Sequence, residues 1–180
     1  MEVGLALLWK QGYNDTGIQE VLKQSGVPKG SFYHHFNSKE DFGLQILDRF
    51  AGMSVASLDR HLARTEVPAM ARLEAFFTEQ RNAFVEQGCR DGCMIGNFGQ
   101  ELAATHDVFR QRVELHMAAM IRRLTACLEQ AQQEGNLSED PKDYADVLFS
   151  CWHGAVLRMK VQQSIDPVDR FIRIFFTTKH

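Results

Sequence analysis

Two cysteines four positions apart are the residues whose type and spacing first suggest chemistry. Cys89 and Cys93 flank Gly92 between two predicted helices, and His106 is the only imidazole nearby along the chain. A structural zinc site needs four ligands, and these three residues do not supply them. Thiols at such positions are most often small packing residues. The pair is therefore either structural or reactive, and spacing alone leaves both interpretations open.

Other catalytic patterns are absent from the sequence. It has no nucleophile with a matching base, no phosphate-binding glycine loop and no paired-carboxylate motif. His34 and His35 are adjacent, and adjacent helical side chains point about 100° apart, so they do not readily chelate one ion. We expect a protein that is not an enzyme and that needs no metal or cofactor. A thiol-dependent enzyme is a distant alternative, which Cys93-dependent turnover by the purified protein would support.

Composition narrows the class further. The chain has 180 residues, of which 44% are hydrophobic and 24% charged, as in soluble globular proteins. A net charge of −3 argues against non-specific nucleic-acid binding, so any DNA contact needs a local patch. No apolar run is long enough to span a membrane and no signal-peptide pattern is visible, which predicts a cytoplasmic protein without membrane contact. In that compartment the four cysteines would be reduced thiols.

The stretch from Val27 to Lys39 predicts a short helix with an exposed polar face. Gly26 can adopt the positive φ of a tight turn, and Pro28 suits the first turn of a helix. Phe32 and Phe36 are four apart, so both face neighbouring helices. The residues left facing outward, together with one at the start of the next helix, are Lys29, Gly30, Ser31, Tyr33, His34 and Lys39. Such side chains suit a DNA major groove, which makes this a candidate recognition helix.

A second helix precedes it. Thr16 is a candidate N-cap, and an apolar stripe follows at Ile18, Val21 and Leu22. A helix, a glycine-containing turn and a second helix form the helix-turn-helix unit. Between Glu20 and Glu40 the chain has no acidic residue, so local potential there would attract a polyanion. On spacing and charge alone, an ordinary helical hairpin is an equally good interpretation.

The order of these residues resembles the DNA-binding domain of the TetR family of repressors. The matching segments are Gly12-Tyr13, Thr16 to Leu22, Gly26 to Phe36 and Ser38-Lys39-Glu40. The resemblance implies an all-α homodimer that binds a palindromic DNA operator and responds to a small-molecule effector. It carries DNA contacts onto the six outward residues named above. Gly17 stands where many members have Ser or Thr, so the contact expected there falls to Thr16 or Gln19.

Helical periodicity continues through the rest of the chain and predicts about nine helices. We expect a helix-turn-helix DNA-binding domain over 1–45 and a helical ligand-binding and dimerisation domain over 46–180. Ser38 caps a long helix to about residue 62, and Asp140-Pro141 and Asp166-Pro167 start the last two helices. These two are apolar round much of their circumference, which suits an intermolecular four-helix bundle. Alternatively they close the monomer's own core. Charges at Phe171 or Phe175 would disrupt either arrangement.

The predicted ligand-binding domain contains two further segments that resemble known family members. Gly92 to Ile95 with Glu101, and Trp152 to Lys160, resemble an electrophile- and redox-sensing branch of the family. If Lys160 lies near Cys93, its ammonium would lower the pKa of the thiol. The other residues expected around an effector are Phe98, His116, Met120, Trp152 and His153. Aromatic and methionine side chains at helical spacing are more often plain core, so both interpretations stand.

One alternative interpretation has the same fold but a different function. The first helix is short for this family, which usually has further residues and a basic lead-in there. Backbone contacts made by that segment would then be missing. A helical ligand-binding and dimerisation module without operator binding is therefore the main alternative.

Overall fold

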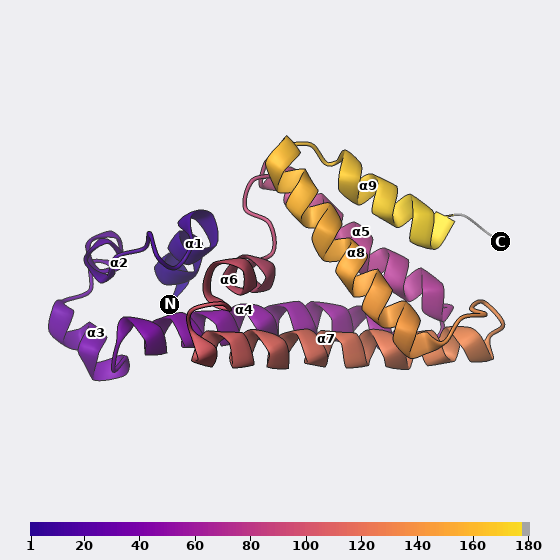
Figure 1. The fold of residues 1–180 in the computed structure, drawn as a ribbon, viewed down its shortest axis with the longest axis horizontal. Helices are drawn as coiled ribbons and strands as arrows, with labels where there is room; N and C mark the ends of the chain where they lie inside the picture. The colour runs from indigo at the N-terminus through magenta and orange to yellow at the C-terminus, as the bar shows by residue number, and fades with distance from the viewer. Residues whose placement is uncertain (178–180) are drawn as a thin grey trace. The chain divides into compact units, whose positions relative to one another are not determined.

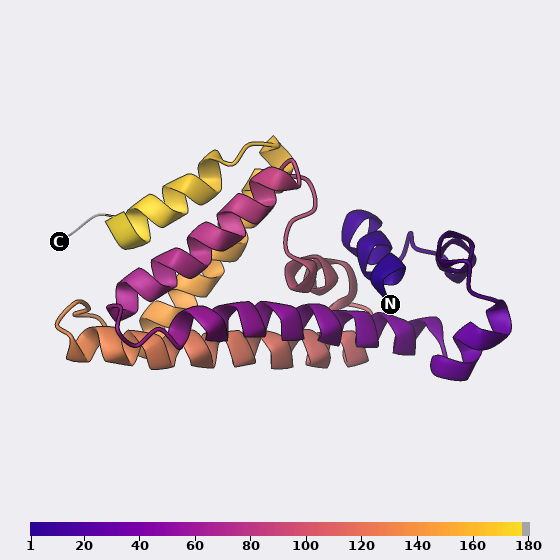
Figure 2. The same cartoon turned by 180° about the vertical axis from the view of Figure 1, so that it is seen from behind.

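The computed structural model describes residues 1–177, and within them the chain is entirely helical (Figures 1 and 2). Nine α-helices and a final π-helical turn are present in that part of the chain, which confirms the predicted fold class. Their bounds are α1 Glu2–Gln11, α2 Ile18–Ser25, α3 Lys29–His35, α4 Lys39–Leu62, α5 Ala69–Glu86, α6 Met94–Leu102, α7 Asp107–Gln133, α8 Pro141–Gln162, α9 Asp166–Ile172 and η1 Arg173–Thr177.

The chain forms two compact units. Unit 1 contains residues 1–53 together with 94–116, and unit 2 contains residues 54–93 together with the chain from Met117 onward. This grouping by contacts differs from the predicted domains at 1–45 and 46–180, because α6 and the start of α7 lie in unit 1 with the N-terminal helices. Those domain bounds stay a prediction. The helices α4 and α7 each contribute to both units.

Short-range signals build the N-terminal part of unit 1. Gly26 has φ 67°, the left-handed conformation that the turn between α2 and α3 requires. The Ser38 hydroxyl accepts the Asp41 backbone N–H at 3.0 Å and so caps α4. Phe32 is buried between Phe36 and Phe42, with ring centroids 4.9 and 5.2 Å away. These contacts fix α3, a helix too short to be stable alone, onto the start of α4.

Two glycines let the helices of unit 1 approach closely. A Cβ at Gly4 on α1 would lie 2.3 Å from the Phe42 ring, and one at Gly43 on α4 would lie 2.7 Å from the Tyr13 ring. Real Cβ atoms do not come that close to their neighbours, so a side chain at either position would push helices apart. Both glycines therefore set how the helix-turn-helix is seated within its unit.

Aromatic packing forms the core of unit 2. Helix α9 packs against both α5 and α8. In Figure 1 α8 lies in front of α5, and in Figure 2 α5 lies in front of α8. The Trp152 ring lies 4.8 Å from Phe77, 5.9 Å from Phe84 and 5.2 Å from Phe171, centroid to centroid. Asp140 caps α8 by accepting the backbone N–H groups of Lys142 and Asp143, as the sequence predicts.

One local expectation is wrong. Thr16 does not cap α2: the N-cap is Gly17, and the Thr16 hydroxyl donates instead to the Gly12 carbonyl at 2.6 Å. Phe171 is 4% exposed and packs inside its own unit, as expected if α9 closes the monomer's own core. No helix in the described part of the chain is long and apolar enough to cross a membrane.

Candidate functional site

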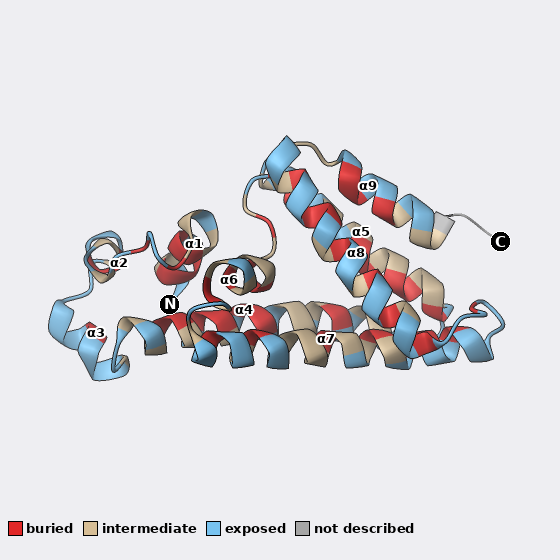
Figure 3. Ribbon diagram, viewed as in Figure 1, coloured by how far each residue is buried: buried red, intermediate tan, exposed pale blue. Residues whose placement is uncertain are grey.

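The outward face of α3 is a continuous polar surface. The side chains of Lys29, Ser31, Tyr33 and His34 are exposed, as is Gly30, while Phe32 is 3% exposed and faces the core. Figure 3 shows α3 almost wholly in the colour of exposed residues. One buried ring thus orients a helix whose remaining side chains are available to a ligand. The structure places these five predicted DNA-contacting residues on one surface.

Two lysines border this surface, and aromatic rings hold both in place. The Lys29 ammonium lies 5.9 Å from the centroid of the Tyr33 ring. The Lys39 ammonium lies 4.5 Å from the centroid of Tyr13 and donates to the Asn14 carbonyl at 3.3 Å. A cation over a ring face is attracted to it and restricted in its rotamers. Both charges are thus partly ordered, Lys29 on α3 and Lys39 at the start of α4.

The start of α2 offers one exposed candidate instead of two. Gln19 is exposed on the first turn of α2. Thr16 is 1% exposed, and its hydroxyl is engaged within the turn. A buried hydroxyl with a satisfied bond cannot reach a nucleic acid without local unfolding. Of the two predicted contacts, Gln19 is the accessible one.

A carboxylate distant in sequence supports the turn before α2. Glu101 on α6 accepts the backbone N–H of Tyr13 at 2.9 Å with one oxygen and that of Asn14 at 2.6 Å with the other. Charge-assisted bonds of this kind are among the stronger hydrogen bonds in proteins. Sequence reasoning missed this role, because Glu101 and the turn are 87 to 88 positions apart. The fold brings the two segments together in unit 1, and a single sequence does not show that.

Two predicted effector residues lie in unit 1. Phe98 on α6 is fully buried between Tyr13 and Phe109, with centroids 6.2 and 5.7 Å away. His116 Nε2 lies 2.7 Å from an Asp48 oxygen, and Arg112 pairs with the other oxygen of the same carboxylate. Phe98 is thus part of the core of unit 1, and His116 joins α7 to α4 within that unit.

The remaining effector candidates lie in unit 2. Cys93, Met120, Trp152, His153 and Lys160 all belong to it, with Cys93 half-buried in the loop before α6 and three of the others on α8. Gly88, Cys89 and Gly92 in this loop all have positive φ, between 58° and 71°. A cysteine in that conformation is uncommon and indicates a constrained backbone. Cys89 itself is buried, so Cys93 is the more accessible thiol of the pair.

His153 is the polar residue of this set with the most defined surroundings. Its Nδ1 lies 3.0 Å from the Phe149 carbonyl, and its ring packs at a tilt against the Phe149 ring, with centroids 4.2 Å apart. Burial on its own would lower the pKa of His153, but the adjacent Cys93 sulfur and the Phe149 carbonyl outweigh it and raise that pKa. Thus Cys93 and His153, 60 positions apart, are electrostatic neighbours.

The four cysteines differ in environment. No disulfide joins any of them, and all four lie in the described residues. Burial raises the pKa of Cys127 to about 11, which keeps it a neutral thiol. Within residues 1–177 no group of three or more His, Cys, Asp and Glu side chains is arranged to hold a metal ion.

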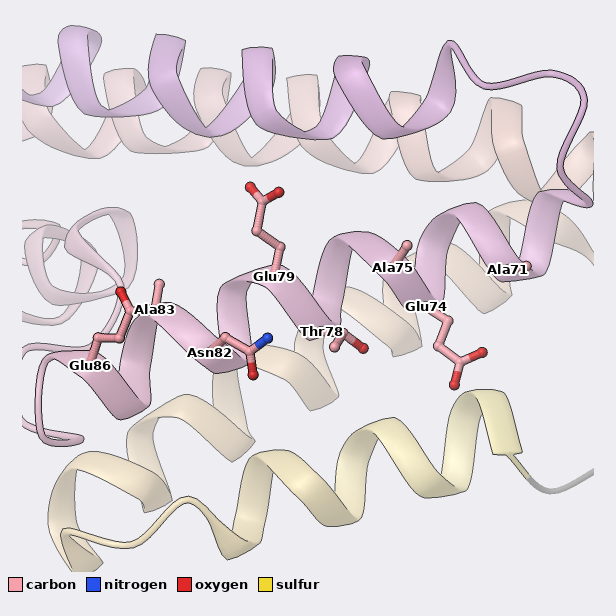
Figure 4. A pocket seen from close by; sticks show the side chains of 8 residues that line it. All are labelled: Ala71, Glu74, Ala75, Thr78, Glu79, Asn82, Ala83 and Glu86. Carbon is pink, nitrogen blue, oxygen red and sulfur yellow. The ribbon is translucent and has the colours of Figure 1, made fainter.

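An open groove runs along one face of α5 in unit 2. Figure 4 shows the carboxylates of Glu74, Glu79 and Glu86 projecting from it among alanines. Glu79 is bound by Ser57 at 2.7 Å and Arg60 at 2.8 Å. The described lining includes none of the predicted effector residues and no aromatic ring. This groove is therefore a solvated acidic surface and does not match the expected effector pocket.

Comparison with known proteins covers nearly the whole chain. Residues 1–46 match the family model of bacterial regulatory proteins of the tetR family, and residues 69–175 match the tetracyclin repressor-like C-terminal domain. The chain is 36% identical to transcriptional regulator AcuR of Cereibacter sphaeroides, over 97% of this chain and 81% of that protein. It is 30% identical to the HTH-type transcriptional repressor NemR of Escherichia coli K12, over 94% of this chain and 86% of that one.

Solved structures agree with this assignment. The crystal structure of a regulatory protein TetR from Rhodobacter sphaeroides has a TM-score of 0.92 at 35% identity, covering 98% of this chain and 94% of the other. The reduced form of E. coli NemR has a TM-score of 0.89 at 29% identity, covering 99% and 96%. The sequence relation and the fold thus point to the same group of proteins.

Proposed function

Because this chain belongs to the TetR family of bacterial DNA-binding transcriptional regulators, we propose that it represses transcription as a homodimer on a palindromic operator and is released when a small electrophile modifies Cys93. The exposed face of α3 is the observation that carries the DNA-binding part. Operator binding implies that the protein acts in the cytoplasm. The relative NemR is called a repressor, which supports repression over activation.

DNA reading divides between two groups of side chains. Lys29 and Ser31, on the first turn of α3, reach base edges in the major groove. Gln19, Tyr33 and Lys39 contact phosphates, which position the protein without reading sequence. Gly30 admits close approach of the backbone, since nothing lies within 4 Å of a Cβ built there. His34 borders the same surface.

A second copy of this chain is the partner for α8. Val147, Leu157 and Val161 are 54%, 44% and 76% exposed, although each is a large apolar side chain. With Cys151 and Gly154 they recur at three- and four-residue intervals, so they form one stripe along the helix. An operator with two half-sites about 34–36 Å apart needs two reading helices, which a homodimer supplies.

Sedimentation at micromolar concentration tests the dimer. Val161→Glu puts a charge in the stripe and should give a folded monomer with greatly weakened operator binding. Lys142→Glu, an exposed position at the start of α8 outside the stripe, is the matched control and should remain dimeric. A monomeric native protein would remove the homodimer from this proposal.

The effector step is tested on DNA. The intergenic DNA beside the gene is first searched for a short palindrome. The purified protein is bound to that DNA and treated with N-ethylmaleimide, a mild thiol-reactive electrophile. We expect release of the native protein, no release of Cys93→Ser, and unchanged DNA affinity of that variant before treatment. An adduct adds volume at Cys93 and removes its ionisable thiol, so it favours one arrangement of the protein over the other.

Two results would replace parts of this account. If Cys93→Ser is released like the native protein, sensing is non-covalent, and His116, Trp152 and His153 become the residues to substitute. If no operator is bound at low salt, the rival function gains support, a helical ligand-binding and dimerisation module without DNA binding.

A further inference from the structure

His153 has a defined tautomer. A backbone carbonyl only accepts hydrogen bonds, so the Nδ1 that lies 3.0 Å from the Phe149 carbonyl must carry a proton. In the neutral imidazole this leaves the Nε2 lone pair available to accept a proton. The Phe149 ring, whose centroid lies 4.2 Å away and whose plane is tilted by 45°, packs against the imidazole in that orientation. His153 is thus arranged as a base with Nε2 as its basic atom.

That Nε2 atom has no ordinary hydrogen-bond partner. It is buried, and no nitrogen or oxygen in the described structure bonds to it. Leaving a buried polar atom unsatisfied is costly, so such an atom in a folded protein calls for an explanation. The ionisable group beside the ring is the Cys93 thiol, whose sulfur raises the pKa of the imidazole even though burial opposes it. A neighbouring sulfur has this effect by accepting a hydrogen bond from the protonated ring and by attracting its charge.

We propose that His153 is the base that converts Cys93 into a reactive thiolate. The inference rests on the proposed function in taking Cys93 as the sensor, and it adds the group that makes this thiol the reactive one among four. Lys160 also lies on α8, but an ammonium has no lone pair and can only stabilise a thiolate that has already formed. A thiol paired with an oriented imidazole is the arrangement of activated cysteine nucleophiles.

The pair suits electrophiles with a polarised carbon–carbon double bond, such as α,β-unsaturated carbonyl compounds. Nε2 takes the proton from the Cys93 thiol, and the thiolate forms a C–S bond to the β-carbon. The π electrons of the double bond move to the α-carbon and carbonyl, and the α-carbon then takes the proton back from Nε2. The net change is addition of S–H across the double bond, with no oxidant, reductant or leaving group.

The test is the rate constant of Cys93 modification by N-ethylmaleimide in the full-length protein, followed by mass spectrometry of its peptides. His153→Gln keeps a planar polar side chain but removes the base. We expect it to react about tenfold more slowly near neutral pH, because an ordinary thiol is only a few per cent thiolate there. Lys160→Met is the matched control on the same helix and should change the rate much less.

The pH profile separates this role from a structural one. With His153 present the rate should already be near its plateau at neutral pH, whereas His153→Gln should rise about tenfold per pH unit, as an ordinary thiol does. The charged groups on the elements that bear the pair are Arg90 and Asp91 in the loop, and Lys142, Asp143, Asp146, Arg158 and Lys160 on α8; all remain in both proteins. The profile difference therefore reports His153.

Each outcome decides the matter. Equal rates and profiles for the native protein and His153→Gln would overturn the proposal, as would a loss confined to Lys160→Met. If His153→Gln fails to fold, as judged by circular dichroism, the native profile decides: a rise only in the range of an ordinary thiol rejects the pair. Failure of the proposed function looks different, because Cys93 would then be modified rapidly while the protein stayed on its operator.

Discussion

The exposed face of α3 and the surroundings of Cys93 present their polar groups in opposite ways. On α3, within seven consecutive residues, one buried ring orients a set of exposed polar side chains. Around Cys93 the groups come from a loop and from α8, 60 positions away, and His153 Nε2 is buried. A surface that meets a large partner can be exposed and local. A thiol that must be selectively reactive needs a solvent-restricted, long-range environment.

The largest effect should come from the single ring on which α3 depends. Phe32→Ala should destabilise the protein by about 3–5 kcal/mol, because it removes the buried side chain between Phe36 and Phe42. Tyr33→Ala, on the exposed face of the same helix, should cost less than about 1 kcal/mol. Denaturant unfolding of the full chain measures both. Similar losses for the two variants would mean that α3 is not anchored through Phe32.

The next largest effect should come from Glu101, which links α6 to the turn before α2. Glu101→Ala leaves the Tyr13 and Asn14 N–H groups without their acceptor and should cost about 1–3 kcal/mol of stability. Glu101→Gln keeps one acceptor oxygen and should lose less. Weaker operator binding should accompany the loss, since the turn carries the start of α2. An alanine variant as stable and as tightly bound as the native protein would contradict this coupling.

Within the DNA surface, the two lysines should behave differently. Lys29→Ala should cost about 1–3 kcal/mol at its preferred operator base and relax the preference there. Lys39→Ala should weaken all sequences alike and reduce the salt slope by about one. Titration of operator variants at several salt concentrations measures both. Equal loss at every site from both variants would show that neither lysine reads a base.

The smallest effect should come from Cys127, the buried counterpart of Cys93. Burial raises the pKa of Cys127 to about 11, so its thiol is protonated near neutral pH. Cys127→Ser should leave electrophile-induced release from the operator unchanged. In the native protein Cys127 should be labelled only after unfolding, as mass spectrometry of alkylated peptides would show. Release that depends on Cys127 would contradict the proposal that Cys93 is the reactive thiol.

The sequence predicts well the turns and helix caps, which depend on interactions between neighbouring residues. Gly26, Ser38 and Asp140 act where they were expected, because turn and cap preferences depend on a few neighbouring residues. The prediction for Thr16 is wrong although it too concerns neighbouring residues. The Thr16 hydroxyl donates to the carbonyl of Gly12, earlier in the chain, and does not accept an N–H from α2. The two options use the same residue type, and only the path of the turn distinguishes them.

The effector set stays a prediction, because it depends on contacts between distant segments. Phe98 and His116 have the apolar and polar character expected of pocket residues, and they contact Phe109 and Asp48 in unit 1. For Phe171 the sequence left both an interface and the monomer core open, and the ring packs on Trp152. Helical periodicity shows which face of a helix is buried and not which partner buries it. A single sequence contains no direct signal for that choice.

The hydrogen bonds from the turn at Tyr13 to Glu101 also mean that the helix-turn-helix segment is not expected to fold independently of α6. A fragment ending at residue 53 would lose the acceptor for two backbone amides and the Phe98 and Phe109 rings that cover Tyr13. A chimera that borrows the operator preference of this chain must therefore carry residues 94–116 as well as the first 53. During synthesis the first helices must likewise wait for α6 to emerge from the ribosome, so the reading region is completed late although it is made first.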